Sequence, residues 1–170
     1  MTTDIHIRPA TADDIALLAD WACAMALETE HKRLDPDTVR RGIRSVIEQP
    51  ARGRYFIAER EVAFAGRELA RVPAGTLMLT YEWSDWRCGD WWWIQSVYVA
   101  PEHRRHGVFA ALYRHVHGLA EAAGEAVCGL RLYVEKENLA AQRTYASLGM
   151  GDAGYLMYEA GMPWLAKVVK

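Results

Sequence analysis

The segment of residues 94–113 reads IQSVYVAPEHRRHGVFAALY: a strand, a basic turn and a helix that begins at a glycine. The first N–H groups of a helix have no partner within it, and the helix dipole adds about half a positive charge there. Arg104, Arg105 and His106 precede Gly107, which lets the backbone approach a ligand closely. The segment predicts a phosphate or pyrophosphate site, with a solvated basic turn as the alternative.

A second pattern lies downstream, where residues 132–150 read LYVEKENLAAQRTYASLGM. Together the two stretches resemble the acetyl-CoA motifs of the GNAT superfamily of N-acetyltransferases. The family loop reads Arg/Gln-x-x-Gly-x-Gly/Ala, and the second motif reads Val-x-x-x-Asn-x-x-Ala-x-x-x-Tyr-x-x-x-Gly-Phe. The matching residues are Arg104, Gly107, Leu112, Val134, Asn138, Ala141, Tyr145 and Gly149. The resemblance is close over residues 94–150 and covers the rest only through element order.

The resemblance implies an α/β fold in which helices flank a mixed, twisted sheet and two neighbouring strands splay apart to admit acetyl-CoA. We expect residues 1–170 to form a single GNAT domain. Val97, Tyr98 and Val99 would pair with the pantetheine arm, and Asn138 would contact the cofactor. The residues expected around the pyrophosphate are Arg104, Arg105, His106, Gly107, Val108, Phe109 and Ala110.

Phe109 departs from the family loop, which carries glycine or alanine at this position. Main-chain N–H groups make the phosphate contacts, so the site is expected to survive if the Phe109 side chain points away from the phosphates. An inward side chain would argue against cofactor binding.

Acetyl transfer to an amine needs a neutral nucleophile, a polarised thioester carbonyl and a proton for the departing thiolate. The resemblance places Tyr145 near the sulfur, and its hydroxyl is the candidate general acid. Some family members carry a basic glutamate where this chain has Trp93, which cannot accept a proton. Glu82 is therefore the first candidate base. The alternatives are a water chain or one of the carboxylates of Glu28, Glu30 and Asp85.

Five of the seven tryptophans lie at positions 83, 86, 91, 92 and 93. In a strand, Trp91 and Trp93 share one face. Trp92 takes the other face, so one of the two sets would line the acceptor site and the other would pack on helices, with Trp93 as the candidate substrate residue. Together with nearby carboxylates, the tryptophans would form an aromatic and acidic site suited to a cationic amine. A tryptophan-rich core or a dimer contact is the alternative. The carboxylates in question are those of Glu28, Glu30, Glu82 and Asp85.

The composition of the chain restricts the classes of partner that the protein is expected to bind. A net charge of -2 and a pI near 6.3 give no basic footprint for nucleic acid, and no apolar stretch suits a membrane. Three widely spaced cysteines indicate a reduced, cytoplasmic protein. The spacing of the histidines argues against a metal site. The apolar tail at residues 162–169 is a candidate homodimer interface.

The sequence therefore predicts an N-acetyltransferase that moves an acetyl group from acetyl-CoA to a primary amine on a small, cationic metabolite. The alternatives are a non-catalytic acyl-CoA sensor, a transferase for protein lysine or N-terminal amines, and a transferase that uses a longer acyl group.

Apolar periodicity, caps and turn residues predict the element order βααβββαβαβ. Strands are expected at residues 5–8, 54–60, 75–81, 91–99, 127–134 and 155–159. Helices are expected after a Thr11–Asp14 capping box to about residue 30, and near residues 35–49, 107–123 and 138–148. Residues 61–73 are expected to extend two strands that a turn at Gly66 joins.

Overall fold

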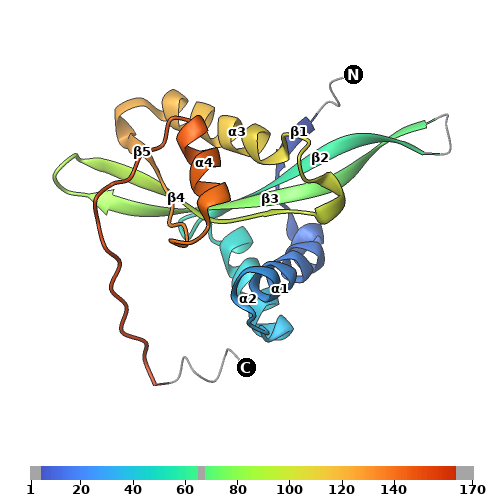
Figure 1. The fold of residues 1–170 in the computed structure, drawn as a ribbon, viewed down its shortest axis with the longest axis horizontal. Coiled ribbons are helices and arrows are strands. Elements are labelled where there is room, and N and C mark those ends of the chain that lie inside the picture. Colours follow the sequence, from blue (N-terminus) through green and yellow to red (C-terminus); the bar gives the residue numbers. More distant parts are fainter. Residues whose placement is uncertain (1–4, 65–67, 164–170) are drawn as a thin grey trace.

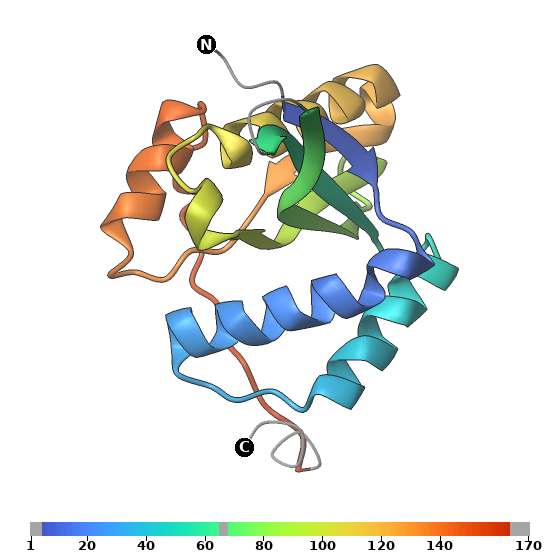
Figure 2. The same cartoon turned by 90° about the vertical axis from the view of Figure 1, so that its right-hand side faces the viewer.

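The computed structural model describes residues 5–64 and 68–163 of the chain. Within them a sheet lies between two layers of helices, with α1 and α2 on one face and α3 and α4 on the other side (Figures 1 and 2). The mixed, twisted sheet flanked by helices that the sequence predicts is therefore confirmed. None of the described helices is both long and apolar enough to cross a bilayer.

The sheet follows the order of the chain, β1-β2-β3-β4-β5. Its first four strands pair antiparallel, and β5 pairs parallel with β4. The strands are β1 (Ile5–Pro9), β2 (Arg54–Phe64), β3 (Glu68–Ser84), β4 (Gly89–Val99) and β5 (Val127–Arg131). The parallel pair requires a crossover, and α3 provides it over one face.

The helices begin and end at the residues that the sequence marks. They are α1 (Ile15–Glu30), α2 (Pro36–Glu48), α3 (Val108–Ala123) and α4 (Leu139–Ser147). The predicted capping box is present, because the Asp14 carboxylate accepts from the Thr11 N–H at 2.8 Å. Asp35 caps α2, with its carboxylate accepting from the Thr38 N–H at 3.1 Å.

Two predicted strands differ from the structure. The strand expected at residues 127–134 ends at Arg131, and the strand expected at residues 155–159 is absent, so that prediction was wrong. Residues 155–159 are exposed there and pair with no described strand, and a single extended segment has no ladder of its own. The expected strand extensions reach Phe64 and start again at Glu68. Gly66, and residues 164–169 of the expected dimer tail, lie outside the described residues.

The two faces of the sheet bury separate apolar clusters. On one face, Leu77, Leu79 and Ile94 pack with Leu112 and Val116 of α3. The other cluster is built around Leu18, Ile43, Ile57 and Tyr98 and joins α1 and α2 to the sheet. Both layers are therefore fixed to the middle strands, and β4 is held from both sides.

Candidate functional site

The ladder between β4 and β5 stops halfway along β4. Its paired residues run from Asp90 with Val127 to Trp93 with Arg131, where β5 ends. Beyond Trp93, β4 still pairs with β3, through Val97 opposite Leu77 and Val99 opposite Gly75. Within the described residues, the edge of residues 94–99 that faces β5 therefore has no strand partner and offers main-chain donors and acceptors to a ligand.

A β-bulge lies where the two strands separate. The register places Ile94 opposite Leu79 and Ser96 opposite Met78, which leaves Gln95 as the extra residue of β4. A bulge bends and twists its strand locally, which carries the end of β4 away from β5. The Tyr133 hydroxyl donates to the Gln95 side chain at 3.1 Å, so the residues after β5 meet β4 again across this gap.

The turn after β4 leads directly into the start of α3. Arg105 and Gly107 both have positive φ, at 65° and 79°, and no side chain caps the first turn of the helix. A Cβ atom built on Gly107 would meet no other atom within 4 Å. Free N–H groups in such a turn form a concave site for anions, and here nothing described covers it.

The Phe109 ring points along α3 toward α4. Its centroid lies 5.6 Å from that of Tyr145 in an edge-to-face contact and 6.2 Å from that of Tyr113. The ring is half buried against the core cluster on this face. Because these contacts orient the ring away from the space beside Gly107, the turn keeps its open face despite the bulky residue.

Tyr145 lies on α4 in a partly buried position against Phe109. Burial raises its pKa above the usual value for tyrosine, because the charged phenolate is poorly solvated there. The hydroxyl is therefore protonated at neutral pH, which is the form that a general acid requires.

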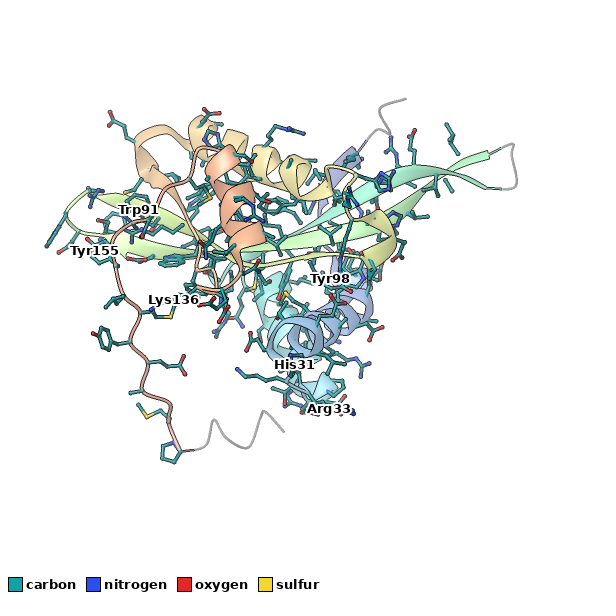
Figure 3. The ribbon with its side chains drawn as sticks, in the orientation of Figure 1. His31, Arg33, Trp91, Tyr98, Lys136 and Tyr155 are labelled. Atoms are coloured by element: carbon teal, nitrogen blue, oxygen red, sulfur yellow. The ribbon has the colours of Figure 1, made fainter. Side chains whose placement is uncertain are left out.

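Arg104 is held by the protein on the side of α1. Its Nη2 atom lies 2.6 Å from Glu28 Oε2, and its Nε atom donates to the Val99 carbonyl oxygen at 3.0 Å. The Tyr98 hydroxyl donates to the other Glu28 oxygen at 3.2 Å, and burial is the first cause that raises its pKa, with the Glu28 charge second. The end of α1 thus holds the start of the turn; Figure 3 labels Tyr98 beside α1.

The remaining residues of the predicted cofactor site lie in the turn before α3 and just before α4. Arg105 and His106 are exposed in the turn before α3. Asn138 caps α4, because its side-chain oxygen accepts from the Ala141 N–H at 3.1 Å. The edge of β4 and the turn thus follow one another along the chain, and the contact between Phe109 and Tyr145 brings α4 beside α3.

The Glu82 carboxylate lies next to the last pair of the ladder, where β4 and β5 separate. One oxygen accepts from the Trp93 indole N–H, and the other lies 3.0 Å from the Arg131 guanidinium. Arg131 in turn stacks 3.9 Å from the centre of the Trp91 ring. Trp91 and Trp93 share one face of the sheet as predicted. The Arg131 guanidinium already covers the Trp91 ring, and its positive charge balances the negative charge of Glu82.

Sequence reasoning missed Arg131 and Tyr133. Their positions on either side of Leu132 were the available signal, since alternate residues in an extended segment face the same side. The Tyr133 ring lies 5.0 Å from that of Trp93. An aromatic and ionic cluster of Glu82, Trp93, Arg131 and Tyr133 thus forms on the face where α1 and α2 pack.

The structure does not bring Glu30 and Asp85 into this cluster. Glu30 pairs with Lys32 at 2.6 Å just beyond α1. Asp85 accepts from the Trp86 N–H in the turn between β3 and β4. From Gly89, beyond that turn, to Val97 a strand covers about 26 Å, at roughly 3.3 Å per residue. Asp85 therefore lies at the far end of the hairpin from the open edge.

The histidines have separate protein contacts. His103 lies 3.1 Å from a guanidinium nitrogen of Arg60, and burial lowers its pKa. His115 packs edge-on against Phe56, and His117 pairs with Glu121 at 3.4 Å. Among the described residues, no three side chains of histidine, cysteine, aspartate or glutamate form a group that could hold a metal ion.

Comparison with known proteins agrees with this architecture. Residues 17–150 match the model of the acetyltransferase (GNAT) family. The solved structure of a possible acetyltransferase from Clostridium difficile 630 is 39% identical, with 93% of this chain and 97% of that chain covered and a TM-score of 0.81. No curated protein matches the chain.

Two more distant structures share the fold. An aminoglycoside N-acetyltransferase in complex with CoA is 16% identical, with 95% of this chain and 97% of that chain covered and a TM-score of 0.68. A ribosomal-protein-alanine N-acetyltransferase from Brucella melitensis biovar Abortus 2308 is 14% identical, with 94% and 100% covered and a TM-score of 0.67. At these identities the likeness concerns the fold alone.

Proposed function

Because this chain belongs to the acetyltransferase (GNAT) family, we propose that it transfers an acetyl group from acetyl-CoA to the primary amine of a small molecule. Acyl transfer follows from the family, and the acetyl donor, the amine and its size are the proposal. One observation supports it above the others: the unpaired edge of β4 runs directly into an open, uncapped start of α3. We further propose that residues 1–170 form one domain that acts in the cytoplasm, which suits its three free thiols.

The residues present fit acetyl-CoA. The edge at Val97 and Val99 would pair with the amides of the pantetheine arm as an added strand does. The N–H groups of residues 107–110 would receive the pyrophosphate, with Arg105 and His106 beside them. Asn138 would contact the cofactor through its amide NH₂ group, because its oxygen already caps α4. When bound, acetyl-CoA supplies an acetyl group activated as a thioester.

The side chains around the opening can then move the protons. The N–H of Val97 would donate to the thioester carbonyl oxygen and draw charge toward it. The Tyr145 hydroxyl, kept protonated by burial, would donate its proton to the departing sulfur. Phe109 holds the Tyr145 ring at one edge, which fixes the direction of the hydroxyl.

The base is supplied, in this proposal, by the strand next to β4. Trp93 stands where some family members carry glutamate, and the Glu82 carboxylate lies against the Trp93 indole nitrogen. Glu82 thus places a carboxylate next to Trp93, which cannot itself act as the general base. Val97 is four residues further along β4, about 13 Å at roughly 3.3 Å per residue, so the proton of the amine would reach Glu82 through water.

Substitution Glu82→Gln is expected to lower kcat by about 10- to 100-fold, at or below the usual minimum of about 100-fold for general base catalysis, because water carries the proton. Glutamine keeps the size and one acceptor for Trp93, so the Kd for acetyl-CoA should stay unchanged. The matched control is Glu61→Gln, which alters another ion-paired strand glutamate, 3.3 Å from Arg71. Equal kcat values in the two variants would remove Glu82 from the mechanism.

Glu28 has a positioning role in this proposal, through its contacts with Arg104 and Tyr98. Exposed ion pairs contribute about 0.2–1 kcal/mol, so Glu28→Gln should raise the KM for acetyl-CoA by about 1.4- to fivefold and leave kcat nearly unchanged. Glu30→Gln, which alters only the pair with Lys32, should leave both constants as they are. A fall in KM for Glu28→Gln would mean that Glu28 withholds Arg104 from the cofactor.

The function is tested by release of free CoA thiol from acetyl-CoA in the presence of separate panels of small amines and of lysine or N-terminal peptides. We expect turnover with a small primary amine. Tight binding of acetyl-CoA without turnover on any amine would instead identify an acyl-CoA sensor, and turnover with peptides alone would identify a protein acetyltransferase. Competition with longer acyl thioesters defines the acyl group.

A further inference from the structure

The surroundings of the Trp91 ring carry more positive than negative charge. The Arg131 guanidinium lies 3.9 Å from the centre of this ring, and the Arg87 guanidinium lies 5.6 Å from it. Among the described residues, Glu82 is the one carboxylate that pairs with either of them, at 3.0 Å from Arg131. Two guanidinium groups and one carboxylate leave one positive charge without compensation, and such a charge attracts an anionic group.

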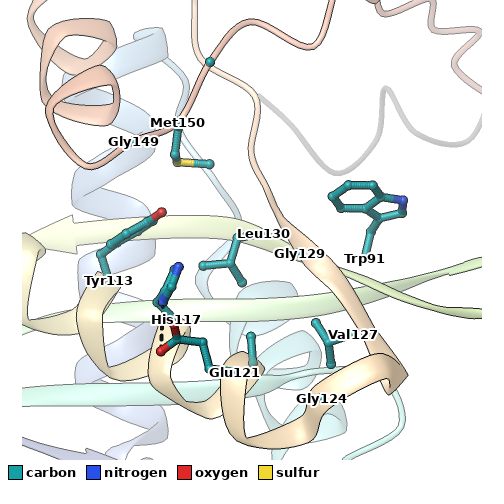
Figure 4. Close-up of a pocket in the computed structure, with 12 residues that line it drawn as sticks. Trp91, Tyr113, His117, Glu121, Gly124, Val127, Gly129, Leu130, Gly149 and Met150 are labelled. Atoms are coloured by element: carbon teal, nitrogen blue, oxygen red, sulfur yellow. Dashed lines mark ion pairs between the residues drawn. The ribbon is translucent and has the colours of Figure 1, made fainter. Parts of the chain in front are cut away.

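The Arg131 guanidinium is held in place and still has donors for a ligand. It stacks on the Trp91 ring, and this ring lies against Gly129 of β5, where a Cβ atom would come within 2.9 Å of it (Figure 4). A guanidinium has five N–H donors, and among the described residues that of Arg131 donates to Glu82 alone. The side chain is 25% exposed, so a carboxylate from solution can reach the remaining donors and bind two of them at once.

An aromatic surface lies between Arg131 and the open edge of β4. The Arg131 guanidinium is 6.0 Å from the centre of the Trp93 ring, and the Tyr133 ring is 5.0 Å from Trp93 on the same face. Tyr133 is 48% exposed, and its hydroxyl donates to Gln95 in the bulge where the open edge begins. Such rings bury the methylene groups of a ligand chain, so they suit an aliphatic segment that runs from Arg131 toward the edge.

The length of β4 sets the length of that segment. Arg131 is paired with Trp93 in the ladder, and from Trp93 to Val97 the strand covers about 13 Å at roughly 3.3 Å per residue. An ion pair of about 2.8 Å at one end and an attack distance of about 3–3.5 Å at the other leave about 7 Å for the ligand. With bonds of about 1.5 Å, an extended aliphatic chain advances roughly 1.3 Å per bond, so about six bonds are needed.

We propose that the acceptor carries a carboxylate about six bonds from its primary amine, and that Arg131 binds this carboxylate. The inference rests on the proposed function, because Val97 marks the thioester only if acetyl-CoA occupies the open edge. In the reaction the amine nitrogen forms a bond to the acetyl carbon and the carbon–sulfur bond breaks. The sulfur takes up a proton, the amine loses one through water to Glu82, and the carboxylate at Arg131 is unchanged.

Three amines with the same six-carbon chain test the proposal by the release of free CoA thiol: 6-aminohexanoate, hexylamine and 1,6-diaminohexane. We expect kcat/KM for 6-aminohexanoate to exceed that for hexylamine by about 10-fold or more, the usual effect of a hydrogen bond between charged groups. The diamine should be the poorest of the three, because its second cation meets the guanidinium groups of Arg87 and Arg131. A shorter acid, 3-aminopropanoate, should lose most of the advantage.

The outcomes separate this inference from the proposed function. Turnover of hexylamine or the diamine at the same kcat/KM as 6-aminohexanoate would overturn the carboxylate site and leave the acetyltransferase intact. An equal kcat/KM for 3-aminopropanoate and 6-aminohexanoate would overturn the inferred length. The absence of turnover with every amine would overturn the proposed function, and this inference with it.

The variant Arg131→Gln tests the residue itself. Both 6-aminohexanoate and hexylamine respond to the loss of the contact with Glu82, so the ratio of their kcat/KM values reports on the carboxylate alone. We expect this ratio to fall by about 10-fold in Arg131→Gln and by less in Arg131→Lys, which keeps the charge but not the paired donors. The matched control is Arg71→Gln, which alters another ion-paired strand arginine, 3.3 Å from Glu61, and should keep the wild-type ratio. A wild-type ratio in Arg131→Gln would exclude Arg131 as the carboxylate site.

Discussion

Replacement of Gly107 by glutamate is expected to abolish the binding of acetyl-CoA. The new side chain would bring a carboxylate to the N–H groups at the start of α3, where it would compete with the pyrophosphate and repel it. The space beside Gly107 is open, so no clash with the fold arises. Calorimetry should register no heat with acetyl-CoA, while thermal unfolding remains cooperative.

Two controls separate charge from backbone strain. Gly107 has a φ of 79°, and a residue with a Cβ there costs about 1–2 kcal/mol, so Gly107→Ala should fold somewhat less stably but retain binding. Gly118→Glu places the same charge on the same helix, at another glycine with open space, and should bind as the wild type does. Full binding by Gly107→Glu would contradict the proposed pyrophosphate site.

Replacement of Tyr145 by phenylalanine is expected to lower kcat by about 10²–10⁴-fold, the usual contribution of a general acid. The ring would still pack against Phe109, so the Kd for acetyl-CoA should remain within about twofold of the wild-type value. Steady-state kinetics together with calorimetry distinguish the two effects.

Tyr113→Phe is the matched control for Tyr145→Phe. Tyr113 touches the same Phe109 ring, and burial raises its pKa as well, but it lies on α3 and lines a cavity between α3, β5 and the residues that follow α4. It should retain nearly full turnover. If both variants kept full turnover, the thiolate would leave without a proton from either tyrosine.

Local signals made much of the fold predictable. Proline, glycine and capping residues mark the ends of the helices. The pair Thr11–Asp14 forms the capping box that its spacing predicts, and Asp35 caps α2 at its expected start. The loop before α3 was predictable for the same reason, because its chemistry lies in consecutive residues. These signals depend on residues that are neighbours along the chain, so they can be recognised without knowledge of the tertiary contacts.

The contacts of the site depend on tertiary structure and were not predictable. Glu28 meets Arg104 across 76 positions of sequence, and Glu82 meets Arg131 across 49. Nothing in the local pattern around Glu28 separates a carboxylate that holds the turn from one that receives an amine. The strand expected at residues 155–159 was mispredicted for a related reason, because an apolar segment becomes a strand only where it pairs with a neighbouring strand, and that pairing is a tertiary contact.

Because the ladder between β4 and β5 is short, β5 and the residues after it are attached to the sheet less stably than the other strands are. Four residue pairs join β5 to the sheet, whereas the ladder between β3 and β4 runs almost the full length of β4. Asn138 and Tyr145 follow β5, and Gly107 follows β4. A molecule that contacts all three residues therefore links the part of the protein around β5 to the part around β4. Ligand occupancy then adds to folding stability by mass action, and the empty protein is the form most open to unfolding and proteolysis.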